Sequence, residues 1–174
     1  HKYGCRIIQR LLEHLAPAQL QGLVDGLLAD AIATCKHPYG NYVMQHLLEY
    51  GMPRQRHELI HLLTMNAETV GKDSYACEVV GKAMALGSRE DQIALARALI
   101  MVPGFGDLMA RTQRGHVSTK LILRVLEGQE YEVARHQLCA EPALPQRPKR
   151  RTVEQQPPRR GRRSQGHEAL HGYR

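Results

Sequence analysis

The sequence is poor in cysteine, and it has no long apolar run. Its four cysteines, Cys5, Cys35, Cys77 and Cys139, are widely separated and form no Cys-x-x-Cys pair, so we expect neither a zinc ribbon nor a disulfide scaffold. No apolar run reaches the roughly 18 residues that span a bilayer, and the first residues do not resemble a signal peptide. We therefore expect a soluble intracellular protein with reduced, structural thiols.

Positive charge is concentrated at the C-terminal end of the chain. The formal net charge is +7, and residues 141–174 alone contain nine Lys/Arg against three Glu. From Pro142 onward the sequence is rich in Pro, Arg and Gln, a composition that cannot bury a core and predicts a disordered tail. Such a tail can add affinity for phosphates that is independent of sequence, act as a nuclear or nucleolar address, or only solubilise the chain.

Four segments of the sequence can be superposed on one another. Each contains one anchor residue, and the anchors are separated by 36, 36 and 39 residues: Cys5, Asn41, Cys77 and His116. A period in the 30s indicates a solenoid, whose units stack because none of them can bury its apolar face alone. Since the chain begins with His1, inside a repeat, we expect it to be part of a longer protein.

Each repeat has the pattern of three helices. The anchor opens the first helix, as in Asn41 to Tyr50, which is followed by the stop signals Gly51 and Pro53. A second amphipathic stretch follows in each complete repeat, over Leu20 to Leu28, Leu59 to Leu63 and Ile93 to Ile100. A short third stretch leads to the next anchor, as in Asp30 to Lys36 or Phe105 to Arg111. We predict an all-α solenoid over residues 1–128, then a capping helix within 129–140 and the tail.

The anchor helices divide into an apolar face and a displayed polar face. At about 100° per residue, Asn41, Tyr42 and Gln45 cluster on one side of their helix, and the apolar residues after them cluster on another. Amide side chains can hydrogen-bond the edge of a nucleobase, while a neighbouring Tyr or Arg stacks on its face. The same division places Cys5, Arg6 and Gln9 together. We interpret Tyr3 and Tyr39, just before these helices, as packing and turn residues.

The segments Tyr3-Gly-Cys-Arg-Ile-Ile-Gln9 and Tyr39-Gly-Asn-Tyr-Val-Met-Gln45 resemble consecutive repeats of the Pumilio/PUF family. The resemblance covers residues 1–126 and implies a right-handed, armadillo-like α-solenoid of ~36-residue repeats that binds single-stranded RNA, one base per repeat. In this family the contacts come from a five-residue motif that starts at the anchor residue. Its first and fifth residues contact the base edge, and its second residue stacks on the base. The resemblance implies that Asn41 and Gln45 read uracil beside Tyr42. It also implies that Cys5 and Gln9 read adenine beside Arg6. Because the family binds RNA antiparallel, the predicted readout is 5′-UA-3′.

The third and fourth repeats depart from the family pattern. Cys77 is followed by Glu78 where a stacking residue belongs, and Gly81 lacks the edge-reading side chain. In the fourth repeat His116 can hydrogen-bond and Lys120 can reach a phosphate or base oxygen, but Val117 stacks poorly. We expect these two repeats to contact RNA weakly or without regard to sequence.

One motif belongs to a different class of protein. His57-Glu-Leu-Ile-His61 matches the zinc-protease pattern H-E-x-x-H, in which two His bind the metal and Glu acts as general base. A catalytic zinc needs a third protein ligand, which the sequence does not supply in the expected place, and Leu59 and Ile60 fit the apolar face of a repeat helix. We interpret the match as chance and expect no metal and no cofactor.

These observations predict a non-enzymatic RNA-binding repeat protein that regulates mRNAs, in particular through their 3′ untranslated regions. We expect it to be a cytoplasmic monomer that acts with effector proteins and without a membrane. Two alternatives stay open. One is a nucleolar PUF-like protein with loose RNA binding in ribosome biogenesis, and the other is an α-solenoid that binds protein.

Overall fold

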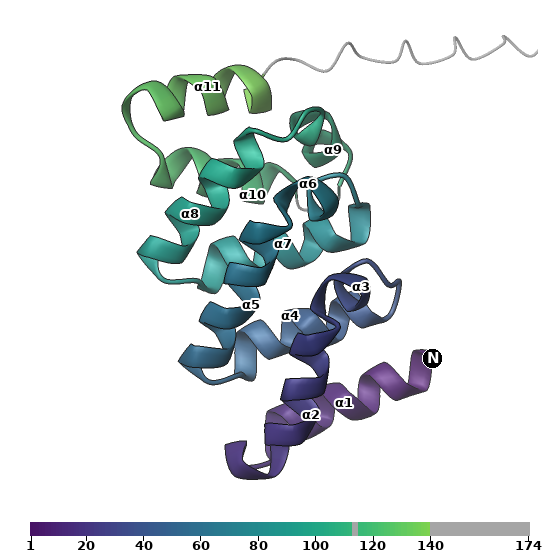
Figure 1. The fold of residues 1–174 in the computed structure, drawn as a ribbon. Helices are drawn as coiled ribbons and strands as arrows, with labels where there is room; N and C mark the ends of the chain where they lie inside the picture. The colour runs from purple at the N-terminus through teal and green to yellow at the C-terminus, as the bar shows by residue number, and fades with distance from the viewer. Residues whose placement is uncertain (113–114, 140–174) are drawn as a thin grey trace, which may run out of the picture. The chain divides into compact units, whose positions relative to one another are not determined.

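The folded chain is built from helices in groups of three, which repeat along its length. The structure is a computed structural model that describes residues 1–112 and 115–139, so the predicted tail lies outside the described residues. Within these ranges there are eleven helices and no strand. The predicted all-α solenoid of three-helix repeats is therefore confirmed (Figure 1).

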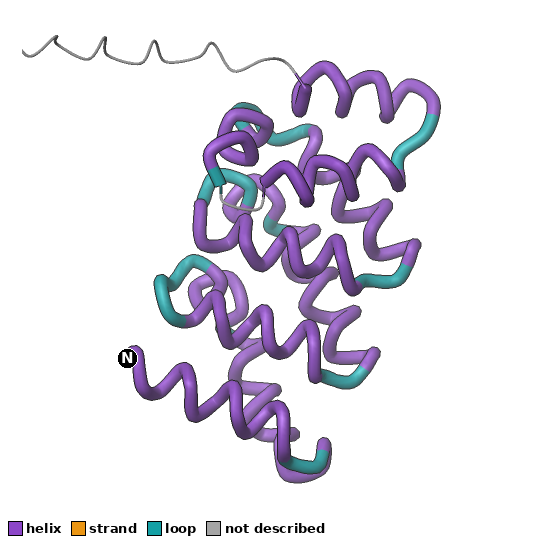
Figure 2. Tube along the Cα trace, turned by 180° about the vertical axis from the view of Figure 1, so that it is seen from behind, coloured by secondary structure: helices purple, strands orange, loops and turns teal. Residues whose placement is uncertain are grey.

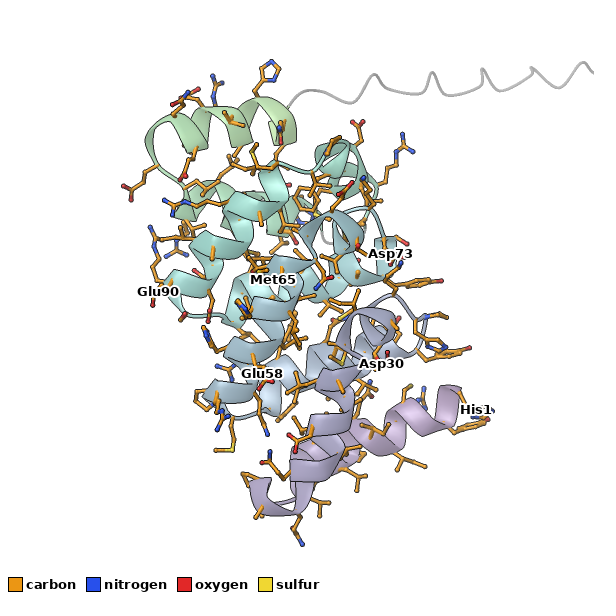
Figure 3. All side chains as sticks on the ribbon, viewed as in Figure 1. His1, Asp30, Glu58, Met65, Asp73 and Glu90 are labelled. Atoms are coloured by element: carbon orange, nitrogen blue, oxygen red, sulfur yellow. The ribbon has the colours of Figure 1, made fainter. Side chains whose placement is uncertain are left out.

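One helix from each repeat joins a continuous stack. These anchor helices are α1 (Lys2–His14), α4 (Gly40–Tyr50), α7 (Ser74–Leu86) and α10 (Gly115–Val125). Each packs directly on the next, and Figure 2 shows the four side by side across the molecule. The stack places equivalent residues of successive repeats in neighbouring positions on one surface.

Two further rows of helices cover the back of this stack. The outer helices are α2 (Pro17–Ala29), α5 (Pro53–Met65), α8 (Arg89–Ile100) and α11 (Gly128–Cys139). The short helices are α3 (Ala31–Cys35), α6 (Ala67–Val70) and α9 (Phe105–Arg111). The apolar core fills the space between the rows and includes Leu47, Leu59, Leu63, Leu99 and Phe105, all with no exposed surface. Truncating one such leucine to alanine costs about 2–5 kcal/mol of stability.

The helix starts follow from a few polar and proline residues. Pro17 and Pro53 occupy the first turn of α2 and α5, where a missing backbone N–H costs nothing. Pro53 therefore marks the end of the anchor helix and also begins the outer helix. The anchor helices are capped by residues that recur every 36 positions. His1 and His37 accept hydrogen bonds from backbone N–H groups through Nδ1, and Asp73 does so through its carboxylate.

The longer spacing before the last anchor has a definite location. A single residue, Asp30 or Asn66, connects the outer helix to the short helix in the first two repeats. Residues 101–104 make the corresponding connection between α8 and α9, and Gly104 adopts the left-handed conformation there, with φ of 78°. The three extra residues are thus absorbed behind the stack, and α10 still packs on α7.

The helix α11 covers α8, α9 and α10 at the C-terminal end of the described chain. It occupies the place of an outer helix in the fourth repeat and lies where the capping helix is predicted. Among the described residues no single helix is long and apolar enough to cross a membrane, although α8 and α9, bent by 107°, reach that length and composition together.

Candidate nucleic-acid interface

The predicted contact residues differ in how far they reach the surface. Among the second-position residues, Arg6 and Tyr42 are exposed, the latter at 52%, and Glu78 is half-buried. The fifth-position residues Gln9 and Gln45 are half-buried beside them. The displayed face is therefore centred on the second position of each motif.

Asn41 is the main correction to the sequence analysis, because its side chain is buried rather than displayed. Only 2% of it is exposed. Its amide nitrogen donates to the carbonyl oxygens of His37 at 2.9 Å and Pro38 at 3.0 Å, and its Oδ1 accepts from Gln45 Nε2 at 3.1 Å. The helical wheel placed Asn41 beside Tyr42, but residue 41 also lies at the border of the apolar face, where the turn before α4 encloses it. Asn41 consequently fixes the start of α4 and orients Gln45.

Gln45 keeps both kinds of hydrogen-bonding capacity toward the surface. Its amide nitrogen uses one proton on Asn41, which leaves one N–H donor and the Oε1 acceptor. A single side chain can thus donate and accept at the edge of a base, while Tyr42 provides an exposed ring one turn away. This pair forms the best-defined part of the surface.

Cys77 is also buried, which corrects its predicted display. Its exposed fraction is 2%, and its thiol donates to the Val70 carbonyl at 3.6 Å. Burial, together with the Asp73 and Glu78 carboxylates, raises the pKa of the Cys77 thiol to about 12. The thiol stays protonated at neutral pH, so Cys77 acts as a packing residue. Cys5, at the same place in the first repeat, is half-buried.

Gly81 on α7 faces Ser118 on α10 at close range. A Cβ atom at this position would lie 2.6 Å from the Ser118 hydroxyl oxygen on α10, which is closer than real Cβ contacts allow. The lack of an edge-reading side chain at position 81 is therefore matched by the packing of α10, because Ser118 lies close to where such a side chain would start. In the fourth repeat His116 and Lys120 are exposed, and Val117 is 44% exposed.

Two neighbouring hollows follow the surface of the stack. The larger, which we call the Tyr42 hollow, measures about 400 Å³ and lies between α4, α7 and α9. The smaller measures about 180 Å³ and lies between α7 and α10 around Gly81. Gln45, Glu78 and Thr112 line both hollows, so these three residues lie between them. The Tyr42 hollow has room for a planar base.

The Tyr42 hollow contains residues that the sequence analysis did not select. Besides the α4 residues it is lined by Ser74, Tyr75, Leu108, Arg111 and Thr112. Tyr75 stands 36 residues after Tyr39, and the tyrosines at positions 3, 39 and 75 are 64%, 40% and 44% exposed. The rings of Tyr3 and Tyr39 lie beside those of His1 and His37, as expected of packing and turn residues, and their exposure also leaves them open to a ligand. Their recurrence every 36 residues, at the start of three anchor helices, was the signal that could have identified them.

The H-E-x-x-H match lies on the outer helix α5, away from this surface. His57 Nδ1 lies 2.6 Å from the Asp91 carboxylate on α8, an interaction that links two repeats. Within the described ranges no three His, Cys, Asp or Glu side chains converge as metal ligands.

Salt bridges connect successive anchor helices beside the contact residues. Glu13 on α1 meets His46 on α4 at 3.0 Å, and Glu49 on α4 meets Lys82 on α7 at 2.7 Å. Both pairs join residues 33 apart and occupy equivalent positions. Side-chain hydrogen bonding to Arg10, with further contributions from the Arg10 charge and His46, lowers the pKa of Glu13. These pairs keep the register of the stack while leaving the readout positions free.

Known proteins resemble the chain in sequence over its first part and in fold over most of its length. The sequence model of the Pumilio-family RNA binding repeat matches residues 1–28 and 32–64. No curated protein matches the chain significantly. Several solved RNA-binding domains have the same fold. The Puf3 domain bound to the Cox17 3′ UTR recognition sequence site A is 23% identical with a TM-score of 0.66, covering 81% of this chain and 40% of its own.

Two other structures give similar values. PUF-8 in complex with PBE-RNA is 21% identical with a TM-score of 0.64, covering 80% of this chain and 41% of its own. Yeast Puf5p bound to SMX2 RNA is 16% identical with a TM-score of 0.64, covering 81% of this chain and 40% of its own. The chain thus spans about two fifths of the length of these domains. The matched residues, 1–28 and 32–64, hold the two repeats with complete motifs, and the later repeats keep the same fold. Residues 1–28 and 32–64 thus match the Pumilio-family RNA binding repeat in sequence, and the chain has the fold of the Puf3, PUF-8 and Puf5p domains.

Proposed function

We propose that the chain binds single-stranded RNA along its anchor helices, reading one base with each of the first two repeats. The observation that carries this proposal is the pairing of an exposed flat side chain with a glutamine one turn away on adjacent stacked helices. Arg6 and Gln9 form this pair on α1, and Tyr42 and Gln45 form it on α4. The solved domains of the same fold named above, which are described as bound to RNA, support the choice of ligand.

The chemistry of Gln45 supports uracil as the base at the second repeat. Uracil presents an N3–H donor beside carbonyl acceptors, and Gln45 has one acceptor and one remaining donor to match them. Asn41 acts indirectly here, because it holds the Gln45 amide in the required orientation. Tyr42 then stacks on the base, which is worth about 1–3 kcal/mol. With adenine at the first repeat, the proposed readout is 5′-UA-3′.

In the third repeat Glu78 stands at the stacking position and Gly81 at the edge-reading position. We therefore propose that this repeat and the next contact RNA loosely, without selecting a base. The chain is therefore a binder with a short specific element, whose full-length form acts on 3′ untranslated regions in the cytoplasm as a monomer with effector proteins. A nucleolar protein with loose binding is the second candidate. It is favoured by the unmatched third and fourth repeats and by the positive charge of residues 141–174.

Selection from a random RNA pool with the whole 174-residue chain tests the proposal. We expect enrichment of sequences containing UA, and loss of that enrichment in Gln45→Ala, with Gln19→Ala on α2 as a matched control. Binding with a steep salt dependence and no enriched sequence favours the loose binder. Absence of RNA binding refutes the proposal and leaves a protein-binding solenoid.

A further inference from the structure

A basic residue recurs five positions before each of the last three anchors. These residues are Lys36, Lys72 and Arg111, and each lies between a short helix and the next anchor helix, or at the end of the short helix. The exposed tyrosines at the start of the first three anchor helices recur every 36 residues. Neither series is part of the base-reading motif. A cation and a phenol recurring together therefore need a separate explanation.

The Tyr42 hollow shows where the two series meet. Tyr75 from α7 and Arg111 from α9 line it together with Tyr42 from α4, so the second and third repeats both contribute to one space. Counting back one repeat, the equivalent residues are Arg6, Tyr39 and Lys72. The two sets predict contacts of the same kind at two consecutive nucleotides.

Arg111 is available for a ligand even though a carboxylate lines the same hollow. Glu78 also lines the hollow, yet no ion pair within 4.0 Å joins it to Arg111 or to another cation in the part of the chain that the structure describes. The guanidinium carries five N–H donors in a fixed fork, which suits a phosphate group. Its charge also offsets the repulsion that Glu78 exerts on an RNA backbone.

We propose that Arg111 and Tyr75 bind the phosphate of the nucleotide whose base stacks on Tyr42, and that Lys72 and Tyr39 do the same one repeat earlier. This proposal rests on the proposed RNA binding and adds a sequence-independent contact at the edge of the readout surface. The Tyr75 hydroxyl donates one hydrogen bond and Arg111 supplies the charge. Lys72 lies 2.6 Å from Glu68, but both side chains are at least half exposed, and such a pair is weak enough for a phosphate to replace.

The salt dependence of RNA binding separates a phosphate contact from a base contact. Binding of the whole chain to fluorescein-labelled 5′-UUUUAUU-3′ and 5′-UUUCCUU-3′ is measured by anisotropy over a series of KCl concentrations. For Arg111→Gln we expect the same fold loss of affinity on both RNAs. The slope of log K against log salt should fall by about 0.7, the value for one phosphate contact on a single strand. Tyr75→Phe should weaken both RNAs equally with the slope unchanged.

Arg54→Gln is the matched control, because Arg54 is exposed on the outer helix α5 and carries the same charge. Equal effects of Arg54→Gln and Arg111→Gln would refute the phosphate contact, as would an Arg111→Gln effect confined to the UA-containing RNA. Gln45→Ala should instead reduce the preference for the UA-containing RNA while keeping the wild-type slope. If the wild-type chain binds neither RNA, both proposals fail. If it binds and prefers UA while Arg111 behaves like Arg54, only the phosphate proposal fails.

Discussion

Replacing Asn41 with alanine separates a structural role from a direct contact with RNA. The side chain is buried, and its amide nitrogen donates to the His37 and Pro38 carbonyls while its Oδ1 accepts from Gln45. The His37 carbonyl keeps a bond from the Asn41 backbone N–H, whereas the Pro38 carbonyl loses the donor that Asn41 supplies. At about 1 kcal/mol for each of the two bonds to backbone, we expect Asn41→Ala to lower the free energy of unfolding by about 2 kcal/mol.

Alanine substitutions at Asn41 and Gln45 should differ in their effect on stability but have similar effects on RNA binding. Gln45→Ala removes one bond at a half-buried position, so we expect a loss below about 1 kcal/mol. Both variants should weaken binding to a UA-containing RNA, because Gln45 is either absent or no longer held. Asn41→Cys, which introduces the residue found at the equivalent positions 5 and 77, should fall between wild type and Asn41→Ala in stability.

Urea denaturation followed by circular dichroism gives the stability, and fluorescence anisotropy with labelled RNA gives the affinity. The argument fails if Asn41→Ala stays within about 0.5 kcal/mol of wild type, a change expected of an ordinary surface substitution. It also fails if Asn41→Ala is destabilised yet binds RNA as tightly as wild type under conditions where it is folded. In that case Gln45 would not depend on its neighbour.

Three further outcomes follow from the structure. Gly81→Ala should cost stability in the wild-type chain but not in Ser118→Ala, and urea denaturation should give a coupling of about 1–3 kcal/mol; equal effects in both backgrounds would contradict the close contact. Burial raises the pKa of Cys35 and Cys77 to about 12, so mass spectrometry after iodoacetamide treatment at pH 8 should find both unlabelled in the folded chain and labelled in urea. Deleting residues 141–174, which contain nine Lys/Arg against three Glu, should reduce RNA affinity at low salt and flatten its salt dependence without changing the preference for UA.

The repeat period predicted most of the fold. Spacings of 36, 36 and 39 residues identified the solenoid, and the short helix expected over Phe105 to Arg111 has those bounds in the structure. The position of the three extra residues was not predictable, because a spacing gives the length of an insertion and not its place. Residue types gave little warning of the loop at 101–104 apart from Pro103 and Gly104. The histidine caps were also missed, since His is not among the usual capping residues.

The exposure of Arg6 and Tyr42 could be predicted from the sequence, but the burial of Asn41 and Cys77 at the first motif position could not. A helical wheel gives the direction of a side chain from its own helix, but burial also depends on the turn that precedes the helix. At Asn41 that turn brings two carbonyl groups within hydrogen-bond distance, and at Cys77 the Val70 carbonyl does the same. Arg111 was missed for a different reason. It lies on the short helix α9, and a helical wheel drawn for an anchor helix does not include it. Side chains at an edge shared by several repeats require the packed structure.

The fold of the later repeats persists without the readout residues because different residues carry the two properties. Buried apolar side chains and cross-repeat pairs such as Glu49 with Lys82 hold the anchor helices together, and neither involves the second or fifth motif position. Substitution at those two positions therefore has little effect on stacking, and a repeat can lose its reader and remain folded. Gly81 is the exception, because Ser118 Oγ lies close to where a side chain at position 81 would begin. Introducing a reader there with Gly81→Gln would consequently require a second change on α10, since the new side chain would meet Ser118.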